Sequence, residues 1–338
     1  MKEKAIRDAT ILVTGGTGSF GHRVATHLRE FGPRQIRVYS RDEKKQWEMQ
    51  RSYPDLHFII GDVRDPERLH EAMRGVDFVF HAAAYKHVHL MEWNPLACFK
   101  NNVLGTAALA SLAERYGVKQ FVMISTDKAV NPRGIMGLSK RLAERVILER
   151  HPSGTLFNVV RFGNVLGSSG SVIPMFQRQI RDGGPVTVTS KEAKRFFMSI
   201  PEAVQLVLQA STLNESNAIF MLEMGEPVSI DDLARNLIEL SGFRVGEDIE
   251  IVYTGLRPGE KLEEELLTHQ ENLEKTAFEK IRLQRNANYD PDKVAGFVHD
   301  LKSVVDIGNI KGLHDLVKEM IPEMIGPDFE EMRRNMFA

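Results

Sequence analysis

Two adjacent ionisable residues of opposite charge, Asp127 and Lys128, are the residues of this sequence best suited to moving protons. They follow the apolar run Gln120–Ile124, which predicts a β-strand, so they lie at the carboxyl end of that strand. In open α/β sheets, ligands bind at this end. The helical pattern that follows carries Met136 and Lys140, which are four residues apart and therefore share one face. The segment predicts acid–base chemistry on a bound substrate.

This arrangement resembles the extended short-chain dehydrogenase/reductases, in which a strand-end Ser or Thr precedes a helix with a Tyr-x-x-x-Lys pair. Here the pair is Met136-x-x-x-Lys140. The run Ser-Thr-Asp-Lys-Ala that begins at Ser125 is more specific. It is similar to the nucleotide-sugar 4,6-dehydratases that act on UDP-N-acetylglucosamine, some of which also have Met in place of Tyr. The resemblance extends from Thr10 to about Leu267.

The resemblance implies a role for each polar residue of the segment. Thr126 would hold the sugar's 4-hydroxyl, Asp127 would be the acid for the departing 6-hydroxyl, and Lys128 would be the base at C5. Lys140 would bind the nicotinamide ribose. Asp127 and Lys128 would each need a pKa displaced toward neutrality, and a partly buried lysine loses its charge readily. Met136 cannot take the proton that Tyr would take from the 4-hydroxyl, and the sequence leaves open which group does.

The implied reaction regenerates its own cofactor. A hydride leaves C4 of the sugar, the resulting 4-ketone acidifies the C5 hydrogen, water is eliminated, and the hydride returns to C6. The product is a UDP-4-keto-6-deoxy-N-acetylhexosamine for cell-surface or secondary glycan biosynthesis. Two alternatives stay open: a UDP-sugar 4-epimerase or 5,6-dehydratase of the same superfamily, and a non-catalytic NADP-binding regulator. A regulator is expected to have lost Asp127 or Lys128, and this chain has both.

A glycine-rich turn near the amino terminus predicts a dinucleotide site. It follows the apolar strand predicted over Thr10–Thr14 and precedes a helical pattern. In this context the glycines let backbone N–H groups approach a pyrophosphate, and the helix amino terminus favours its negative charge. The residues that we assign to the cofactor here are Gly15, Thr17, Gly18, Ser19, Phe20 and Gly21.

The end of the second predicted strand, Gln35–Tyr39, favours NADP, with NAD as the less favoured cofactor. An NAD site usually has Asp or Glu here for the ribose 2′-hydroxyl, whereas Ser40 and Arg41 suit a 2′-phosphate. Asp42 opposes this assignment unless it caps the next helix. The cofactor set is completed, partly through the resemblance, by Lys44, Lys45, Asp62, Val63, Ala82, Lys86, Ser125, Lys140 and Asn164.

The segments after the catalytic helix predict a cleft for a UDP-sugar. A loop rich in Gly and Ser follows Gly163 and suits a backbone that folds over a sugar and a diphosphate. Arg195 and Arg257 match uridine- or diphosphate-binding segments of the resembled family, and arginine pairs bidentately with phosphate. A surface ion pair is the alternative for either one. We assign to the substrate Lys86, Thr126, Asn164, Val165, Ser171, Thr187, Arg195, Arg257 and Glu260.

The strands and helices alternate at intervals of roughly 20–30 residues, which predicts an α/β fold with a doubly wound parallel sheet of the Rossmann type. We assign residues 1–165 to an NADP-binding Rossmann domain. Residues 166–320 are assigned to a smaller substrate-binding lobe, partly interleaved with the sheet, which includes amphipathic helices at Ile200–Gln209 and Ser229–Leu240. Residues 321–338 are predicted to form a helical tail.

Composition argues against several classes of partner. The net charge of −2 provides no basic excess for nucleic acid. The one cysteine, Cys98, fits a reducing compartment. No window approaches the ~20 apolar residues of a membrane span, and the first residues have no apolar signal core. We therefore expect a cytoplasmic protein without membrane contact. We expect no metal, because His87 and His89 lack a third ligand of suitable spacing.

Relatives of the resembled family associate through long helices packed around the helix that holds the lysine. The helical pattern over Asn94–Tyr116 is a candidate for this contact, so we expect a homo-oligomer, either a dimer or a hexamer.

Overall fold

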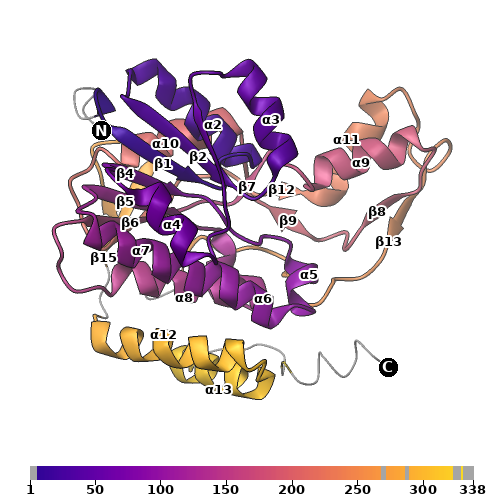
Figure 1. Ribbon diagram of the computed structural model, residues 1–338. Helices are drawn as coiled ribbons and strands as arrows, with labels where there is room; N and C mark the ends of the chain where they lie inside the picture. The colour runs from indigo at the N-terminus through magenta and orange to yellow at the C-terminus, as the bar shows by residue number, and fades with distance from the viewer. Residues whose placement is uncertain (1–5, 268–271, 286–288, 323–328, 330–338) are drawn as a thin grey trace.

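The computed structural model describes residues 6–267, 272–285, 289–322 and 329. At its centre, nine strands form a sheet in the order β14-β15-β11-β6-β5-β4-β1-β2-β3 (Figure 1). All of them pair in parallel except β15 and β14, which run antiparallel at one edge. The strands are β1 (Thr10–Thr14), β2 (Gln35–Ser40), β3 (His57–Ile60), β4 (Phe78–His81), β5 (Gln120–Ile124), β6 (Leu156–Arg161), β11 (Ala218–Leu222), β14 (Glu274–Lys275) and β15 (Ile281–Arg285).

Helices cover both faces of the sheet, so the predicted doubly wound Rossmann fold is confirmed. The helices α2 (Ser19–Leu28) and α10 (Ile200–Ala210) pack together on one face, over the larger apolar core. On the other face lie α4 (Pro66–Met73), α7 (Gly105–Arg115) and α8 (Ile135–Leu148). The central strands are buried because parallel sheets are covered on both sides. The helix predicted at Ile200–Gln209, which we placed in the partly interleaved lobe, packs against α2 on the sheet.

A small lobe stands apart from the sheet and has its own core (Figure 1). Phe176 and Ile180 of one helix pack there against Ala234 and Ile238 of another. The lobe consists of α9 (Val172–Arg181), α11 (Ile230–Leu240) and the parallel strands β8 (Val186–Val188) and β13 (Ile251–Tyr253). Two short strand pairs join it to the Rossmann part: β7 (Asn164–Val165) with β10 (Phe197–Met198), and β9 (Lys194–Arg195) with β12 (Val228–Ser229).

The predicted helix Asn94–Tyr116 is divided into three consecutive segments. They are α6 (Pro95–Phe99), the π-helical segment η2 (Lys100–Leu104) and α7. π-helical turns are rare and occur often at functional sites. This one carries Asn102, which is buried, accepts from the Tyr85 backbone N–H (2.8 Å) and donates to the hydroxyl of Ser139 on α8 (2.9 Å). Asn102 therefore has a buried hydrogen-bonding role that joins the Tyr85 backbone to α8.

The helices α12 (Pro291–Asp306) and α13 (Ile310–Met320) form a third layer under α6, η2 and α8 (Figure 1). Phe297, Leu301, Leu313 and Val317 are buried there against the outer side of that layer. We placed this range in the substrate-binding lobe; in the structure the apolar stripes of both helices face the Rossmann domain. The layer also covers part of the helix face through which we expected subunits to associate. Of the predicted tail, residues 323–328 and 330–338 lie outside the described residues.

None of the described helices is both long enough and apolar enough to cross a membrane.

A buried ion pair connects α8 to β6, the strand that follows it, and to Ser125, which follows β5. The carboxylate of Glu144 accepts from Nε and Nη2 of Arg161 on β6 (2.8 and 2.7 Å) and from the hydroxyl of Ser125 (2.6 Å). Glu144 is 0% exposed and Arg161 is 1% exposed. Burial alone would raise the pKa of Glu144, but the guanidinium lowers it below its ordinary value. The pair thereby sets the position of the helix that carries Lys140.

We expect Arg161→Met to lower the free energy of unfolding by about 3–5 kcal/mol, because it leaves the Glu144 carboxylate buried without its main cation. Urea denaturation followed by circular dichroism measures this loss. Arg285→Met is the matched control, since Arg285 on β15 pairs with Glu215 at the exposed surface. Exposed pairs contribute little. If both variants lost the same free energy of unfolding, this would contradict our conclusion that the Glu144–Arg161 pair holds α8 in place.

Candidate active site

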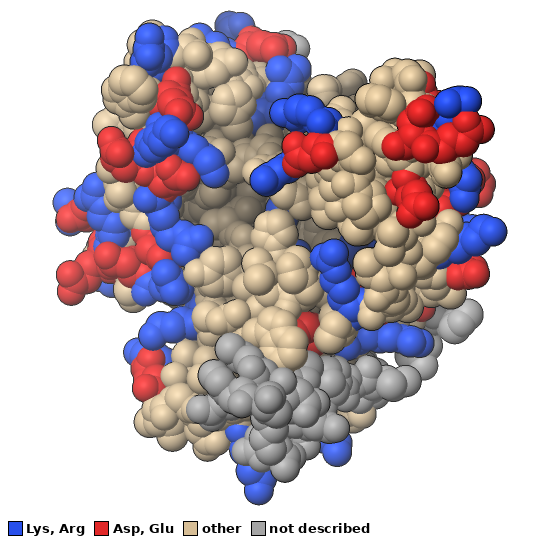
Figure 2. Space-filling model, turned by 90° about the vertical axis from the view of Figure 1, so that its right-hand side faces the viewer, with Lys and Arg blue, Asp and Glu red and all other residues tan. Residues whose placement is uncertain are grey.

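A cavity of about 790 Å³ opens at the carboxyl ends of the parallel strands, between the Rossmann sheet and the small lobe. It is lined by the glycine-rich turn, the end of β2, the segment after β5, the start of α8 and the loops of the lobe. The face seen in Figure 2 is hollowed near its centre, with Lys and Arg atoms along part of the rim. The cationic residues Arg41, Lys45, Lys86 and Arg257 line the cavity, which suits an anionic ligand.

Nearly all of the residues predicted for the site line this cavity, although they come from segments far apart in the sequence. Three do not. Lys44 is exposed and lies 3.9 Å from Glu48, Asp62 is paired with Arg64, and Asp127 lies behind the cavity wall. All the other assigned residues line the cavity, so the segments predicted for the cofactor and for the substrate lie around one cavity.

The glycine-rich turn can approach a ligand only because two of its residues lack side chains. Gly15 has φ +67°, and a Cβ there would lie 2.8 Å from the Ala82 backbone at the end of β4. A Cβ on Gly21 would lie 2.4 Å from the Gly15 carbonyl. The turn therefore packs directly on β4 and leads into α2, whose amino terminus favours a phosphate. This arrangement fits the pyrophosphate of a dinucleotide.

The end of β2 is organised by side-chain hydrogen bonds. The Ser40 hydroxyl accepts from Thr17 and from Gln46, both at 2.9 Å. Asp42 caps α3 (Glu43–Ser52) by accepting from the Lys45 backbone N–H (3.0 Å), as the sequence suggested. Asp42 therefore has a structural role, which removes one objection to a 2′-phosphate at this strand end.

Arg41 rests on an aromatic side chain that the sequence did not single out. Its Nη1 donates to the hydroxyl of Tyr85 (2.9 Å), and its guanidinium carbon lies 5.1 Å from the Tyr85 ring centre. Asp62, which we assigned to the cofactor, accepts from Arg64 through both oxygens and lies 3.7 Å from Arg41. Burial alone would raise the pKa of Asp62, but the contacts with Arg64 and Arg41 lower it below its ordinary value.

We predict that Arg41→Asp inverts the cofactor preference from NADP to NAD. The change removes the cation available to a 2′-phosphate and supplies a carboxylate for the 2′-hydroxyl. Dissociation constants for both cofactors, measured by calorimetry on the two proteins, test this. Arg64→Asp is a matched control beside the same carboxylate. Equal or tighter NAD binding by the unaltered protein would contradict the assignment.

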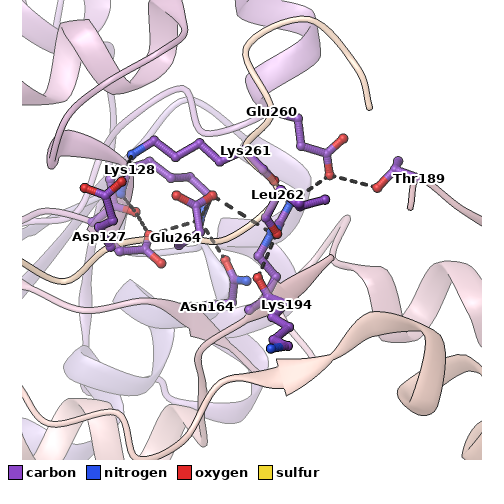
Figure 3. Close-up of polar contacts among 12 residues, drawn as sticks. Asp127, Lys128, Asn164, Thr189, Lys194, Glu260, Lys261, Leu262 and Glu264 are labelled. Carbon is purple, nitrogen blue, oxygen red and sulfur yellow. Dashed lines mark hydrogen bonds and ion pairs between the residues drawn. The ribbon is translucent and has the colours of Figure 1, made fainter. Parts of the chain in front are cut away.

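Asp127 and Lys128 lie in a short 3-10 turn, η3 (Asp127–Ala129), directly after β5. The ammonium of Lys128 donates to Asp127 Oδ1 (2.9 Å) and to Asn164 Oδ1 (3.1 Å), and the Thr126 hydroxyl donates to the same Asp127 oxygen (2.8 Å). Figure 3 shows the close pairing of Asp127 and Lys128. Asp127 is buried and does not line the cavity. Its neighbours Thr126 and Lys128 both line the cavity, so Asp127 can act on a ligand only through them.

The expectation that the pKa of Lys128 is displaced toward neutrality was wrong. Burial alone would lower this pKa, but the charges of Asp127 and Glu264 together raise it above its ordinary value. The lysine displaced toward neutrality is Lys140, whose pKa burial lowers to about 8, with Glu144 opposing the shift. Its Nζ donates to the Ile124 carbonyl (2.7 Å). Lys128 is thus an ammonium in the free protein, whereas Lys140 loses its proton near neutral pH.

The remaining predicted residues divide between the cavity and its supports. Ser125 lines the cavity but directs its hydroxyl to Glu144, so its side chain supports the fold. Lys86, whose pKa burial lowers, donates to the Ser169 carbonyl (2.8 Å). The Ser169 N–H donates to Ser19 of the glycine-rich turn (3.0 Å). The loop after β7 therefore contacts the glycine-rich turn, which we assigned to the cofactor, whereas we expected this loop to fold over the sugar and diphosphate of the substrate.

The helix α8 begins against a buried carboxyl group. Glu92, at the end of α5 (Val88–Glu92), accepts from the Ile135 backbone N–H (2.8 Å), and burial raises the pKa of Glu92 to about 7. A Cβ on Gly259 would lie 2.5 Å from the same carboxyl oxygen. Met136, the second residue of this helix, is buried and lines the cavity at the position where the resembled enzymes usually have Tyr.

Arg195 holds protein groups with its guanidinium. Nη1 donates to the carbonyls of Lys194 and Leu262 (2.7 and 2.9 Å), and Nη2 donates to Glu260 and to the Lys261 carbonyl (2.9 and 2.8 Å). Arg195 is therefore engaged in an ion pair with Glu260, the kind of contact that we named as the alternative to ligand binding. This arginine is buried, although it also lines the cavity.

The other predicted substrate residues are at the lobe side of the cavity. Arg257 and Glu260 line it from the loop after β13, and Thr187 lines it from β8. The Thr187 hydroxyl accepts from Gln179 of α9 (2.7 Å), which joins the strand to the helix. Arg257 stays exposed and available for an anion.

Sequence reasoning missed Glu264. Its carboxylate oxygen lies 3.5 Å from Lys128 Nζ, and it lines the cavity. No signal in the sequence separates it from its neighbours Glu263 and Glu265 in the same acidic run.

The parallel sheet, the glycine-rich turn and the lysine helix after a strand-end threonine define a class of protein, the Rossmann-fold short-chain dehydrogenase/reductases. Within this class, residues 11–286 match the family described as polysaccharide biosynthesis protein, and the chain belongs to that family.

Individual relatives agree with this assignment. The capsular polysaccharide biosynthesis protein CapD of Staphylococcus aureus is 47% identical over 309 residues, which cover 88% of this chain and 51% of that protein. The chain thus spans about half the length of this relative. A UDP-glucose 4-epimerase of Rickettsia conorii is 41% identical over 274 residues, or 78% of this chain and 79% of that one. The X-ray structure of Pen from Bacillus thuringiensis superposes with a TM-score of 0.79 and 34% identity, covering 85% of this chain and 92% of that one.

Proposed function

We propose that the protein is an NADP-dependent UDP-N-acetylglucosamine 4,6-dehydratase that makes a UDP-4-keto-6-deoxy-N-acetylhexosamine for glycan biosynthesis. The observation that carries the proposal is the hydrogen-bonded pair of Asp127 and Lys128, with Nζ 2.9 Å from Oδ1, at the wall of a cavity that the dinucleotide turn also lines. Elimination of water needs an acid and a base side by side. The name of the S. aureus relative supports a role in polysaccharide synthesis.

The cofactor would lie on the glycine-rich turn, with its ribose near Lys140 and a 2′-phosphate near Arg41. When bound, the nicotinamide supplies the chemistry of accepting a hydride from C4 and returning it at C6. Lys140, with a pKa lowered to about 8, is the group that we assign to the 4-hydroxyl proton, because Met136 cannot take it.

The resting pair must exchange one proton before elimination. Transfer from Lys128 Nζ to Asp127 along their hydrogen bond gives a neutral amine and a protonated carboxyl together. The amine then takes the C5 proton, and the carboxyl proton goes to the departing 6-hydroxyl, which leaves as water. Because Asp127 lies behind the wall, its proton travels through the Thr126 hydroxyl, which shares the same oxygen. The pair is then ammonium and carboxylate again. As C6 receives its hydride, Lys128 returns a proton to C5, and the proton that Lys140 took from the 4-hydroxyl passes through solvent to Lys128, so that both lysines end as they began.

A UDP-sugar 4-epimerase is the second candidate, favoured by the name of the R. conorii relative. An epimerase returns the hydride to the carbon that lost it and needs no elimination, so the Asp127–Lys128 pair would have no task. Incubating the purified protein with UDP-N-acetylglucosamine and NADP, followed by mass spectrometry, separates the candidates. We expect the loss of one water. An unchanged mass with an inverted C4 centre by NMR would replace our proposal with the epimerase, and NMR also distinguishes a 4-keto-6-deoxy product from a 5,6-alkene.

A further inference from the structure

Lys128 faces a second carboxylate that no step of the proposed reaction uses. Glu264 Oε1 lies 3.5 Å from Lys128 Nζ (Figure 3). The same oxygen lies 3.9 Å from Nε of Arg195. The Glu264 side chain is 3% exposed. Its second oxygen, Oε2, is buried without a hydrogen-bond partner among the residues that the structure describes, and so is Oδ2 of Asp127.

Glu264 is held at this place by the backbone around it. The Leu262 carbonyl accepts from the Lys194 N–H (3.1 Å) and from Arg195 (2.9 Å), and the Lys261 ammonium donates to the Val130 carbonyl (2.9 Å). The segment is thus tied both to β9 and to the turn after Lys128. A carboxylate this deeply buried is costly unless a cation compensates it.

We propose that Glu264 is a positioning residue for the elimination: together with Asp127 it holds the Lys128 ammonium between two carboxylates and determines the pH at which Lys128 releases its proton. The role of Lys128 as the base rests on the proposed function, but its contact with Glu264 does not. The charged groups that face Lys128 are Asp127 from the same turn, Glu264 from the segment after Lys261, and Arg195 from β9, which opposes the two carboxylates.

The sign of the effect follows from the charges. A nearby negative charge favours the ammonium form, so removing it makes Lys128 lose its proton at a lower pH. We expect Glu264→Gln to move the midpoint of Lys128 deprotonation down by about one pH unit or more, because the two charges are close and shielded from water. Any limb of the pH–rate profile that Lys128 governs should move the same way.

The test measures Lys128 directly and needs no turnover. The full-length protein with NADP bound is labelled with an amine-reactive reagent over a range of pH, and the extent of labelling at Lys128 is read by peptide mass spectrometry. Glu263→Gln is the matched control, because Glu263 is the preceding residue, is 61% exposed and pairs with Lys194. We expect the control to leave the midpoint unchanged and Asp127→Asn to lower it.

An unchanged midpoint in folded Glu264→Gln would overturn the inference, even if the protein proves to be a dehydratase. A lowered midpoint in a protein that fails to dehydrate UDP-N-acetylglucosamine would support the inference and reject the proposed function. If Glu264→Gln does not fold, Glu264→Asp serves instead: the charge stays but moves away by one methylene, so the midpoint should fall by a smaller amount. No shift in that variant would also overturn the inference.

Discussion

Replacing Lys128 with alanine should lower the rate of dehydration by at least ~10²–10⁴-fold, the usual contribution of a positioned base. Binding of NADP and of the UDP-sugar should stay close to that of the unaltered protein, because Lys128 contacts Asp127, Asn164 and Glu264 in the wall of the cavity. In deuterated water the variant should leave the C5 hydrogen of the sugar unexchanged. NMR of the recovered nucleotide sugar measures this exchange independently of product formation.

Two further variants make this experiment decisive. Lys128→Ala removes the cation that Asp127 and Glu264 share and leaves Glu264 with Arg195 alone. Lys128→Gln, which keeps N–H groups for both carboxylates, is therefore measured beside it for folding and exchange. Lys86→Ala tests the alternative base, since Lys86 lines the same cavity and burial lowers its pKa. Normal C5 exchange in folded Lys128→Ala, with loss of exchange in Lys86→Ala, would move the base to Lys86.

Replacing Lys140 with alanine should have a different effect from replacing Lys128. It should weaken NADP binding and also lower the rate of 4-ketone formation by ~10²–10⁴-fold. The reason is that the Lys140 amino group serves two tasks in the proposal: it contacts the nicotinamide ribose and, when unprotonated, accepts the 4-hydroxyl proton. Calorimetry with NADP and absorbance of the reduced nicotinamide in a single turnover measure the two losses. Tight NADP binding by the variant would contradict the ribose contact.

The same helix provides the control. Met136 lies one turn before Lys140 in the cavity wall, and its thioether carries no proton, so Met136→Leu should cost little and Met136→Tyr should be tolerated. Near-complete loss of turnover in folded Met136→Leu would show that the sulfur has a task. The pKa of about 8 for Lys140 adds a pH dependence. A base works when unprotonated, so ketone formation should rise with pH up to about 8 and then level off.

The order of strands and helices in the Rossmann part was readable from the sequence, because its signals are local. The strands β1, β3 and β5 begin and end where their apolar runs do, and the glycine-rich turn lies between β1 and α2 as its spacing predicts. Such patterns act over a few residues, so they survive without knowledge of the neighbours. The same local signals predicted that Asp42 caps α3.

The placement of the later helices was not readable in this way. The pattern over Ile200–Gln209 correctly indicated the helix α10, but an apolar stripe does not say which surface it will cover. In the structure α10 joins α2 on the sheet, and α12 with α13 covers α6 and η2. The sequence therefore described the elements, and packing decided which domain each one belongs to.

The residues of the candidate active site show the same difference between what local spacing predicts and what tertiary packing decides. The sequence by itself determined that Asp127 and Lys128 end a buried strand and that Lys140 shares a helix face with Met136, because each is a matter of spacing along one element. Only the tertiary structure brought Glu264 to Lys128 and Arg161 to Glu144. Protonation depends on burial and on charges brought near by the whole chain. For that reason the structure reversed the expected pKa shift of Lys128 and assigned the lowered pKa to Lys140.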